Sequence, residues 1–322
     1  MPSVTLARHA MATRFEIVLH GGDPVALRAA GEEALDEIDR LEAQLSLYRN
    51  TSEIAHLNAR AGRQAVRVTP SLFALLQQAK QLHQESGGAF DITIGPLVRC
   101  WGFMGGGGHS PSPDELAEAR SRVGMDLVQL RPEDFTVQFA REGVMLDLGA
   151  IGKGYAIERA VEVLRQAGVA SALLHGGTST VYALGKPPEA VAWKAAVENP
   201  QTQQPDGSPS TLAAIPLKDE ALSVSAVWGK SFEEKGKTFG HVIDPRSGEP
   251  AKAALLAAVV LPSATETDAL STALLTLGRE GHGRIAKLRA GMRTLLLSEA
   301  EGDFRIETNG IALHPGHASR LG

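Results

Sequence analysis

The chain has 322 residues, 43% of them hydrophobic, and a formal net charge of -5 at pH 7. This composition is enough to bury a sizeable core, and the acidic balance argues against a nucleic-acid-binding surface as the main feature. Cys100 is the only cysteine, which excludes an internal disulfide and a metal site built from several thiolates.

The N-terminal third predicts two paired strands and two helices. Residues 3–8 and 14–20 are expected to form the strands, and residues 23–46 place apolar side chains at helical spacing. The second helix is expected to begin at Pro70 and to end before Gly87, since proline favours the first helical position and glycine favours the C-terminal end.

The first residues lack a basic region followed by an apolar region, and they include no cysteine that could carry a lipid. No apolar run is long enough to span a bilayer, which needs about 20 such residues. We therefore expect a cytoplasmic protein that does not insert into a membrane.

A glycine-rich stretch, residues 102–115, is the most linker-like part of the chain because its four consecutive glycines remove side-chain restraint. We expect a flexible surface loop at about residues 104–113. The flanking segments look like one continuing fold. We therefore expect a single domain over residues 1–322, made of two tightly associated halves.

The middle of the chain predicts a strand at 144–151, a helix that Gly168 ends, and a strand beginning at about Ser171. The first amides of a helix and its dipole together favour a bound anion, and Lys153 adds a positive charge at that turn. The alternative is a tight turn that needs glycine for its backbone geometry alone.

The last third predicts several strands and one further helix. Ser263 and Glu266 match a capping box at the start of that helix, and its apolar stripe runs through Leu270 and Leu274. The expected strands lie near residues 213–217, 238–243, 254–261, 293–298 and 303–308.

On this helix Asp268 and Thr272 are four residues apart and share one face. A carboxylate and a hydroxyl in this arrangement suit Mg²⁺, which prefers oxygen ligands. The alternative is that Asp268 complements the helix dipole and Thr272 bonds its own backbone.

Four other positions leave a functional and a structural interpretation open. His241, where a strand runs into a turn, can act as a general base near neutral pH or can be a satisfied strand histidine. Asp244 can orient it, bind a metal or cap the turn. Asp91 either pins a loop or holds a ligand donor, and Tyr48 is either a core residue or a stacking surface for a planar ligand.

The order of seven segments is more specific than any one of them. They read AMATRFEIVLHG, LSLYRNTSEIAHLN, GGAFDITIGPLVRCWGF, LDLGAIGKGYAIE, LLHGGTSTVYALG, HVIDPRSGEP and TETDALSTALLTLG. In this order, from about Met11 to about Gly278, they resemble the ApbE family, the FAD:protein FMN transferases.

The resemblance implies an α+β fold related to the T-fold, with mixed and antiparallel sheets packed against helices. It implies FAD as substrate and Mg²⁺ as cofactor. It also implies transfer of FMN from FAD to a threonine hydroxyl of a target flavoprotein through a phosphoester bond, with AMP leaving. The alternatives are an FAD pyrophosphatase that gives FMN and AMP, and a non-catalytic FAD-binding protein.

By the same resemblance, Asp268, Thr272 and the backbone carbonyl of Ala150 hold the metal. His241 is then the base that takes the threonine proton, and Asp268 is the second catalytic residue. The positions that match FAD contacts are Met11, Tyr48, Ala89, Phe90, Asp91, Gly149, Lys153, His241 and Ile243.

The chain departs from the family pattern at a few loop positions. Ala12 stands in a Met-Ala-Thr sequence where the family commonly has Met-Gly-Thr. Val224, Ala226 and Thr178 also replace commoner residues. These differences concern local loop geometry more than the chemistry.

Overall fold

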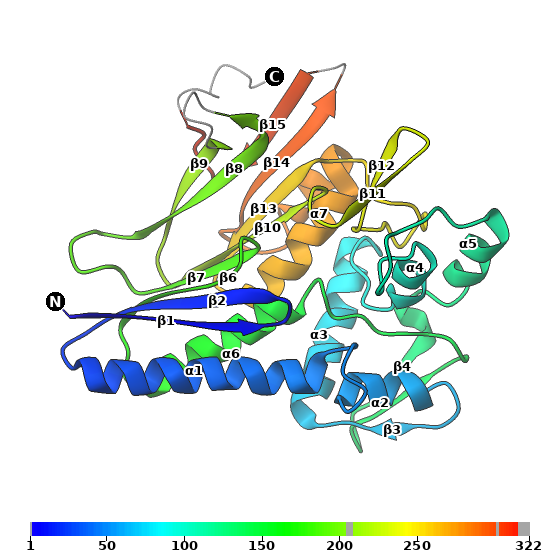
Figure 1. Ribbon diagram of the computed structural model, residues 1–322, viewed down its shortest axis with the longest axis horizontal. Coiled ribbons are helices and arrows are strands. Elements are labelled where there is room, and N and C mark those ends of the chain that lie inside the picture. The colour runs from blue at the N-terminus through cyan, green and yellow to red at the C-terminus, as the bar shows by residue number, and fades with distance from the viewer. Residues whose placement is uncertain (1, 204–208, 301–302, 315–322) are drawn as a thin grey trace.

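The computed structural model describes residues 2–203, 209–300 and 303–314, and its centre is one sheet of eight antiparallel strands (Figure 1). The strands follow the order β1-β2-β6-β7-β10-β13-β14-β15 across the sheet. Their bounds are Ser3–Ala10 (β1), Thr13–His20 (β2), Ser171–Gly176 (β6), Thr180–Leu184 (β7), Glu220–Ala226 (β10), Leu256–Leu261 (β13), Arg293–Ala300 (β14) and Asp303–Asn309 (β15).

Both faces of this sheet are covered. The helices α1 (Pro24–Leu45), α6 (Gly152–Gln166) and α7 (Ala264–Ile285) pack on one face and form the main apolar core with it. The ribbon of β8 (Trp193–Gln203) and β9 (Pro209–Leu217) packs on the other face. All six residues of β13 are buried because side chains on both sides of this strand meet a packed layer.

A smaller part of the chain lies to the right of the large sheet in Figure 1. It holds a three-stranded sheet, several short helices and, further along the chain, a separate two-stranded hairpin. The elements are α2 (Glu53–Arg60), β3 (Val66–Arg67), α3 (Pro70–Ser86), α4 (Gly95–Cys100), α5 (Pro113–Arg120), a short 3-10 helix (Met125–Leu127), β4 (Val128–Arg131), β5 (Thr136–Phe139) and the hairpin strands β11 (Ser231–Glu234) and β12 (Lys237–Gly240).

The α+β prediction is confirmed, and so are most of the elements expected from the sequence. The α3 helix begins at Pro70, where the Oγ1 of Thr69 accepts a hydrogen bond from the Leu72 amide at 3.4 Å. It ends at Gly87, whose φ of 64° is left-handed and suits glycine. Proline and glycine therefore marked the two ends of this helix correctly.

The strand predicted at 144–151 is wrong. Only Met145 makes a bridge, with Ile94, and the neighbouring backbone groups of Leu146 and Asp147 bond to other partners. The side-chain amide of Asn58 bonds the Leu146 amide at 2.8 Å and the Leu146 carbonyl at 2.9 Å, and the Asp147 amide bonds the Ile92 carbonyl. A side chain thus satisfies backbone groups that a neighbouring strand would otherwise pair.

Two other boundaries differ from the prediction. The strand expected at 238–243 is β12, which ends at Gly240, so His241 follows the strand. The capping box of α7 is half formed: Ser263 accepts the Glu266 amide at 3.2 Å, but the Glu266 carboxylate binds Arg289. The helix also continues beyond Gly278, where a φ of 61° and a ψ of -148° mark a kink.

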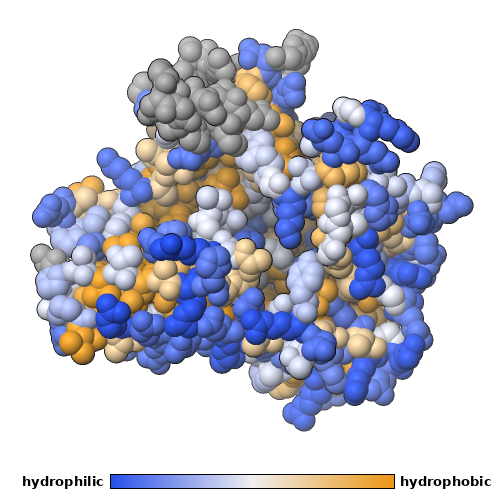
Figure 2. Space-filling view, viewed as in Figure 1, coloured by the Kyte–Doolittle hydropathy of each residue, from blue (hydrophilic) through white to orange (hydrophobic). Residues whose placement is uncertain are grey.

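The single domain with two associated halves stays a prediction, although one apolar cluster includes Phe15 of the large sheet and Phe139 of the small one. The glycine-rich loop lies between α4 and α5, and Gly108 packs against the ring of Phe232 in β11. Its flexibility also stays a prediction. None of the helices in the described ranges is long and apolar enough to cross a bilayer. Figure 2 shows mainly hydrophilic side chains around α4 and α5, with apolar ones mainly in the left half.

The turn between β1 and β2 is strained. Its two residues, Met11 and Ala12, have φ values of 48° and 58°, a left-handed conformation that glycine adopts more readily. We expect Ala12→Gly to raise the free energy of unfolding by about 1 kcal/mol, measured by urea denaturation, since relief of this strain outweighs the added chain entropy. Ala10→Gly, in the adjoining strand, is the control and should lower it.

Candidate active site

Asp268 belongs to α7, but its carboxylate lies at the N-terminus of α6. Its Oδ2 accepts a hydrogen bond from the Gly154 amide at 2.9 Å, and the residue is only 4% exposed. Burial raises the pKa of Asp268, while the charge of Lys153 and the Gly154 amide act to lower it. One of the amides expected to meet an external anion is therefore taken by the chain's own carboxylate.

This contact leaves a backbone oxygen without its usual partner. In a regular α-helix the Gly154 amide would donate to the carbonyl of Ala150. Because it donates to Asp268, the Ala150 carbonyl accepts no hydrogen bond from any residue in the described ranges. A partly buried carbonyl of this kind is available to a cation or to water.

Thr272 adds a third oxygen, one helical turn after Asp268. Its Oγ1 donates to the Asp268 backbone carbonyl at 3.3 Å, as the structural alternative for Thr272 expected, and lies 3.1 Å from the Ser225 Oγ. A carboxylate, a carbonyl and a hydroxyl are hard donors of the kind that Mg²⁺ prefers. The described part of the chain has no group of three or more His, Cys, Asp or Glu side chains that could hold a metal. The chemistry of these three oxygen donors fits the predicted ion.

Gly154 allows the two helices to approach this closely. A Cβ at Gly154 would overlap the Ala264 carbonyl oxygen and lie 2.7 Å from the Cβ of Asp268. We therefore expect Gly154→Ala to lower the free energy of unfolding by about 1–3 kcal/mol, the usual cost of overpacking, when measured by urea denaturation. It should also weaken the predicted Mg²⁺ site, since Asp268 loses its position.

Gly152, two residues earlier, is the matched control for this substitution. A Cβ there would come no closer than 3.8 Å to its neighbour, the Cβ of Leu148, which is ordinary van der Waals contact. We expect Gly152→Ala to leave stability and Mg²⁺ binding nearly unchanged. Equal effects of the two substitutions would contradict the packing argument.

Two serines of β10 belong to the site and were missed in the sequence. The Ser225 Oγ lies 2.8 Å from the Ser271 Oγ and also contacts Thr272, while the Ser223 Oγ lies 2.8 Å from the Thr267 Oγ1. Ser223 and Ser225 are two apart in a strand, so their side chains point to the same face, which here meets α7. The two-residue spacing of Ser223 and Ser225 in a strand was the signal in the sequence that could have identified them.

His241 lies at the foot of the β11–β12 hairpin. Its amide and its Nδ1 lie 3.0 and 3.1 Å from the carbonyl oxygen of Lys230. A carbonyl oxygen can only accept, so Nδ1 carries the proton in this contact and Nε2 keeps a free lone pair. Burial lowers the pKa of His241, the Lys230 carbonyl acts to raise it, and the charges of Lys153 and Lys230 lower it further. The imidazole is therefore neutral at pH 7 and can accept a proton.

Asp244 does not orient His241. Its carboxylate accepts hydrogen bonds from the backbone amide and the guanidinium of Arg246, so it fixes the turn that follows. The Trp101 Nε1 donates to the Gly248 carbonyl at 2.8 Å and fastens the same turn. Of the three roles considered for Asp244, capping the turn is the one observed.

The positive charge of Lys153 influences the pKa values of Asp268, Asp147 and His241. Its Nζ donates to the Gly149 carbonyl at 3.2 Å, and its charge acts on the pKa values of Asp268 and His241. It also acts on Asp147, a residue that sequence analysis did not single out. Burial raises the pKa of Asp147, while the Gly149 amide, Lys153 and Lys230 act to lower it.

Tyr48 lies near the same group and on the surface. Its side chain is in the set of large hydrophobic residues that remain exposed, at 68%. Burial of its hydroxyl and the charge of Asp147 both raise the pKa of Tyr48. Of the two interpretations left open, a stacking surface fits this position and a core residue does not.

The side chains of residues 89–91 are buried in the structure. Ala89 and Phe90 are each 1% exposed and pack in the main core. The Asp91 Oδ1 accepts the Thr93 amide and hydroxyl at 2.7 and 2.6 Å, and its Oδ2 lies 3.1 Å from the His83 Nδ1. Asp91 therefore pins this loop, as one of the two interpretations had it.

The structure brings part of the predicted set together. The Asp268 carboxylate binds the Gly154 amide, whose usual helical partner is the Ala150 carbonyl, and Thr272 follows Asp268 by one turn of α7. The charge of Lys153 acts on both Asp268 and His241. Met11, in the β1–β2 turn, packs against the main core, and Ile243 packs in a separate apolar cluster. No hydrogen bond or ion pair between described residues joins these two to Asp268, and their part in FAD binding stays a prediction.

Known proteins are similar to this chain over most of its length. The model of the ApbE family matches residues 11–296. The FAD:protein FMN transferase of Treponema pallidum is 35% identical over 264 residues, covering 79% of this chain and 73% of that protein. The protein of the same name from Haemophilus influenzae is 31% identical over 268 residues, covering 80% and 76%. The crystal structure of the ApbE protein from Thermotoga maritima has a TM-score of 0.84 at 25% identity, covering 97% of this chain and 96% of that one. The resemblance found in the sequence is thus confirmed, and the chain belongs to the ApbE family.

Proposed function

We propose that this chain transfers the FMN part of FAD to a threonine hydroxyl of an acceptor flavoprotein, forming a phosphoester bond and releasing AMP. One observation carries the proposal. The Gly154 amide binds Asp268 in place of the Ala150 carbonyl, so a carboxylate and a carbonyl oxygen are both left for a cation at one helix crossing. The names of the related proteins support the same activity.

Asp268, Thr272 and the Ala150 carbonyl would hold Mg²⁺ at this crossing. When bound, the ion neutralises negative charge on the diphosphate of FAD and on the group that leaves. The buried Asp268 supports this role, because an ionised carboxylate in such a place needs a compensating cation. The Ser225 hydroxyl, which also bonds the Ser271 hydroxyl, keeps Thr272 in position.

His241 would accept the proton of the acceptor threonine. Its neutral imidazole holds Nδ1 against the Lys230 carbonyl, so Nε2 is the atom that takes the proton. The threonine oxygen forms a bond to the FMN phosphorus, and the bond from that phosphorus to the AMP phosphate breaks. The electron pair leaves with AMP. Lys153 supplies positive charge beside these groups.

The remaining predicted residues would bind FAD. Tyr48 offers an exposed ring on which the flavin or the adenine can stack. The Gly149 turn adjoins Ala150 and Lys153 in the chain. The loop that Asp91 pins lies beside this segment, since the Ile92 carbonyl accepts the Asp147 amide. Met11, Ala89, Phe90 and Ile243 complete the proposed contacts.

The test incubates the protein with FAD, MgCl₂ and candidate acceptor flavoproteins. Transfer gives a fluorescent acceptor band that survives denaturation, together with one AMP per labelled acceptor. An FAD pyrophosphatase would give free FMN and AMP with no labelled acceptor. A non-catalytic FAD-binding protein would leave FAD intact. EDTA should stop the reaction and added MgCl₂ should restore it, since the proposed ligands are all oxygen atoms.

A further inference from the structure

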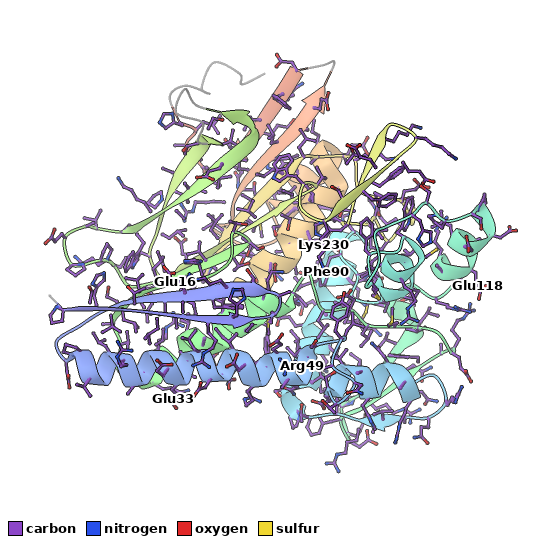
Figure 3. The ribbon with its side chains drawn as sticks, in the orientation of Figure 1. Glu16, Glu33, Arg49, Phe90, Glu118 and Lys230 are labelled. Atoms are coloured by element: carbon purple, nitrogen blue, oxygen red, sulfur yellow. The ribbon has the colours of Figure 1, made fainter. Side chains whose placement is uncertain are left out.

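Lys230 stands next to the proposed base. Its carbonyl accepts the His241 amide at 3.0 Å and lies 3.1 Å from the His241 Nδ1, so the backbone of the two residues is held together. Figure 3 shows Lys230 in the middle of the molecule, where the β11–β12 hairpin begins. Its side chain therefore starts beside the imidazole.

The ammonium group of Lys230 is available to a ligand. Lys230 is exposed, and no ion pair joins it to another residue within the described ranges. By contrast, Arg246 in the following loop is paired with Asp244 at 2.7 Å. An unpaired lysine next to a buried site can form an ion pair with a bound anion.

Lys153 and Lys230 interact electrostatically with the same two side chains. Lys153, on α6, and Lys230, on the hairpin, both act on Asp147 and on His241. They approach from separate elements, and Lys153 is fixed through the Gly149 carbonyl. Two cations on separate elements near one site are suited to a ligand that carries two negative charges.

We propose that Lys230 binds the diphosphate of FAD together with Lys153 and stabilises the charge that the AMP phosphate gains as it leaves. This inference rests on the proposed function. Lys153 is the other cation that acts on His241, from a separate element. Without Lys230 the diphosphate would have one lysine in place of two to form charge-assisted hydrogen bonds.

The test compares Lys230→Met and Lys230→Arg with the wild-type chain by titration calorimetry with ADP in the presence of MgCl₂. ADP carries the diphosphate without the flavin. We expect Lys230→Met to weaken ADP binding roughly 10- to 100-fold, as for the loss of one charge-assisted hydrogen bond, and to leave adenosine binding unchanged. Lys230→Arg should restore most of the affinity. AMP release in the transfer assay should fall by a similar factor in Lys230→Met.

Lys237→Met is the matched control, because Lys237 is an exposed lysine of the same hairpin in β12. It should behave as the wild-type chain does. ADP affinity within twofold of wild type in Lys230→Met would overturn the inference, and so would equal losses in both variants. If the wild-type chain labels no acceptor, the proposed function fails, whereas the ADP titration still decides the role of Lys230.

Discussion

Replacing Asp268 with asparagine should abolish flavin transfer and remove the effect of Mg²⁺ on the melting temperature. The amide keeps the size of the side chain and can still accept the Gly154 hydrogen bond, but it carries no charge. We expect turnover to fall at least about 10³-fold, since a bound metal contributes several kcal/mol of charge stabilisation in the transition state. Initial rates and Mg²⁺ titrations followed by thermal unfolding measure the two effects.

The same substitution should act differently on the metal-free protein. The folded pKa of Asp268 is raised above its usual value of 3.8, so the folded chain holds this proton at a higher pH than the unfolded chain. The contribution of Asp268 to stability therefore falls as pH rises from about 3.8 through the folded pKa. In EDTA at pH 7, Asp268→Asn should be at least as stable as the wild-type chain.

Asp114→Asn, at an exposed carboxylate of α5, is the control and should respond to Mg²⁺ as the wild-type chain does. A melting temperature that Mg²⁺ raises equally in Asp268→Asn and in the wild-type chain would show that Asp268 is not a ligand. Retained turnover at limiting Mg²⁺ would lead to the same conclusion.

Replacing His241 with alanine should lower kcat by about 10²–10⁴-fold while FAD affinity stays nearly unchanged. The imidazole is needed to take the threonine proton, and FAD binding has other proposed contacts. Because burial lowers the pKa of His241 below its usual 6.5, the wild-type kcat/KM should fall only as pH drops below that value. This acid limb should be absent from the residual activity of the variant.

His56→Ala is the matched control, since His56 is an exposed histidine of α2. It should keep both the rate and the pH profile of the wild-type chain. The base role of His241 would be excluded by unchanged turnover in His241→Ala, or by an acid limb that persists there at the same pH. A loss confined to FAD affinity would instead assign His241 to binding.

Much of the fold could be read from local signals. Pro70 and Gly87 gave the ends of α3, and the apolar spacing of residues 23–46 gave α1, because these features act within one element. The segment 144–151 was misread because it is as apolar as a strand. Its backbone partners, the Asn58 side chain and the Ile92 carbonyl, lie far away in the sequence, and no local pattern announces them.

The candidate site could be predicted only in part. Asp268 and Thr272 share a helix face, so their pairing follows from spacing. Their meeting with Ala150 depends on how closely α6 and α7 cross, which Gly154 permits and which only the family resemblance suggested. Asp147 and Lys230 were missed because they interact electrostatically with each other and lie on segments that are distant in the sequence.

The hairpin of β11 and β12, which ends next to His241, should respond to heat separately from the rest of the protein. Its strands of four residues pair only with each other in the described ranges, and stacked rings of Phe232 and Phe239 hold it against Trp101. Two-stranded units of this size are marginally stable by themselves. Local opening of this unit would withdraw the imidazole while the eight-stranded sheet stays folded. Activity should therefore decline reversibly, in a cooperative step of its own, at temperatures below global unfolding.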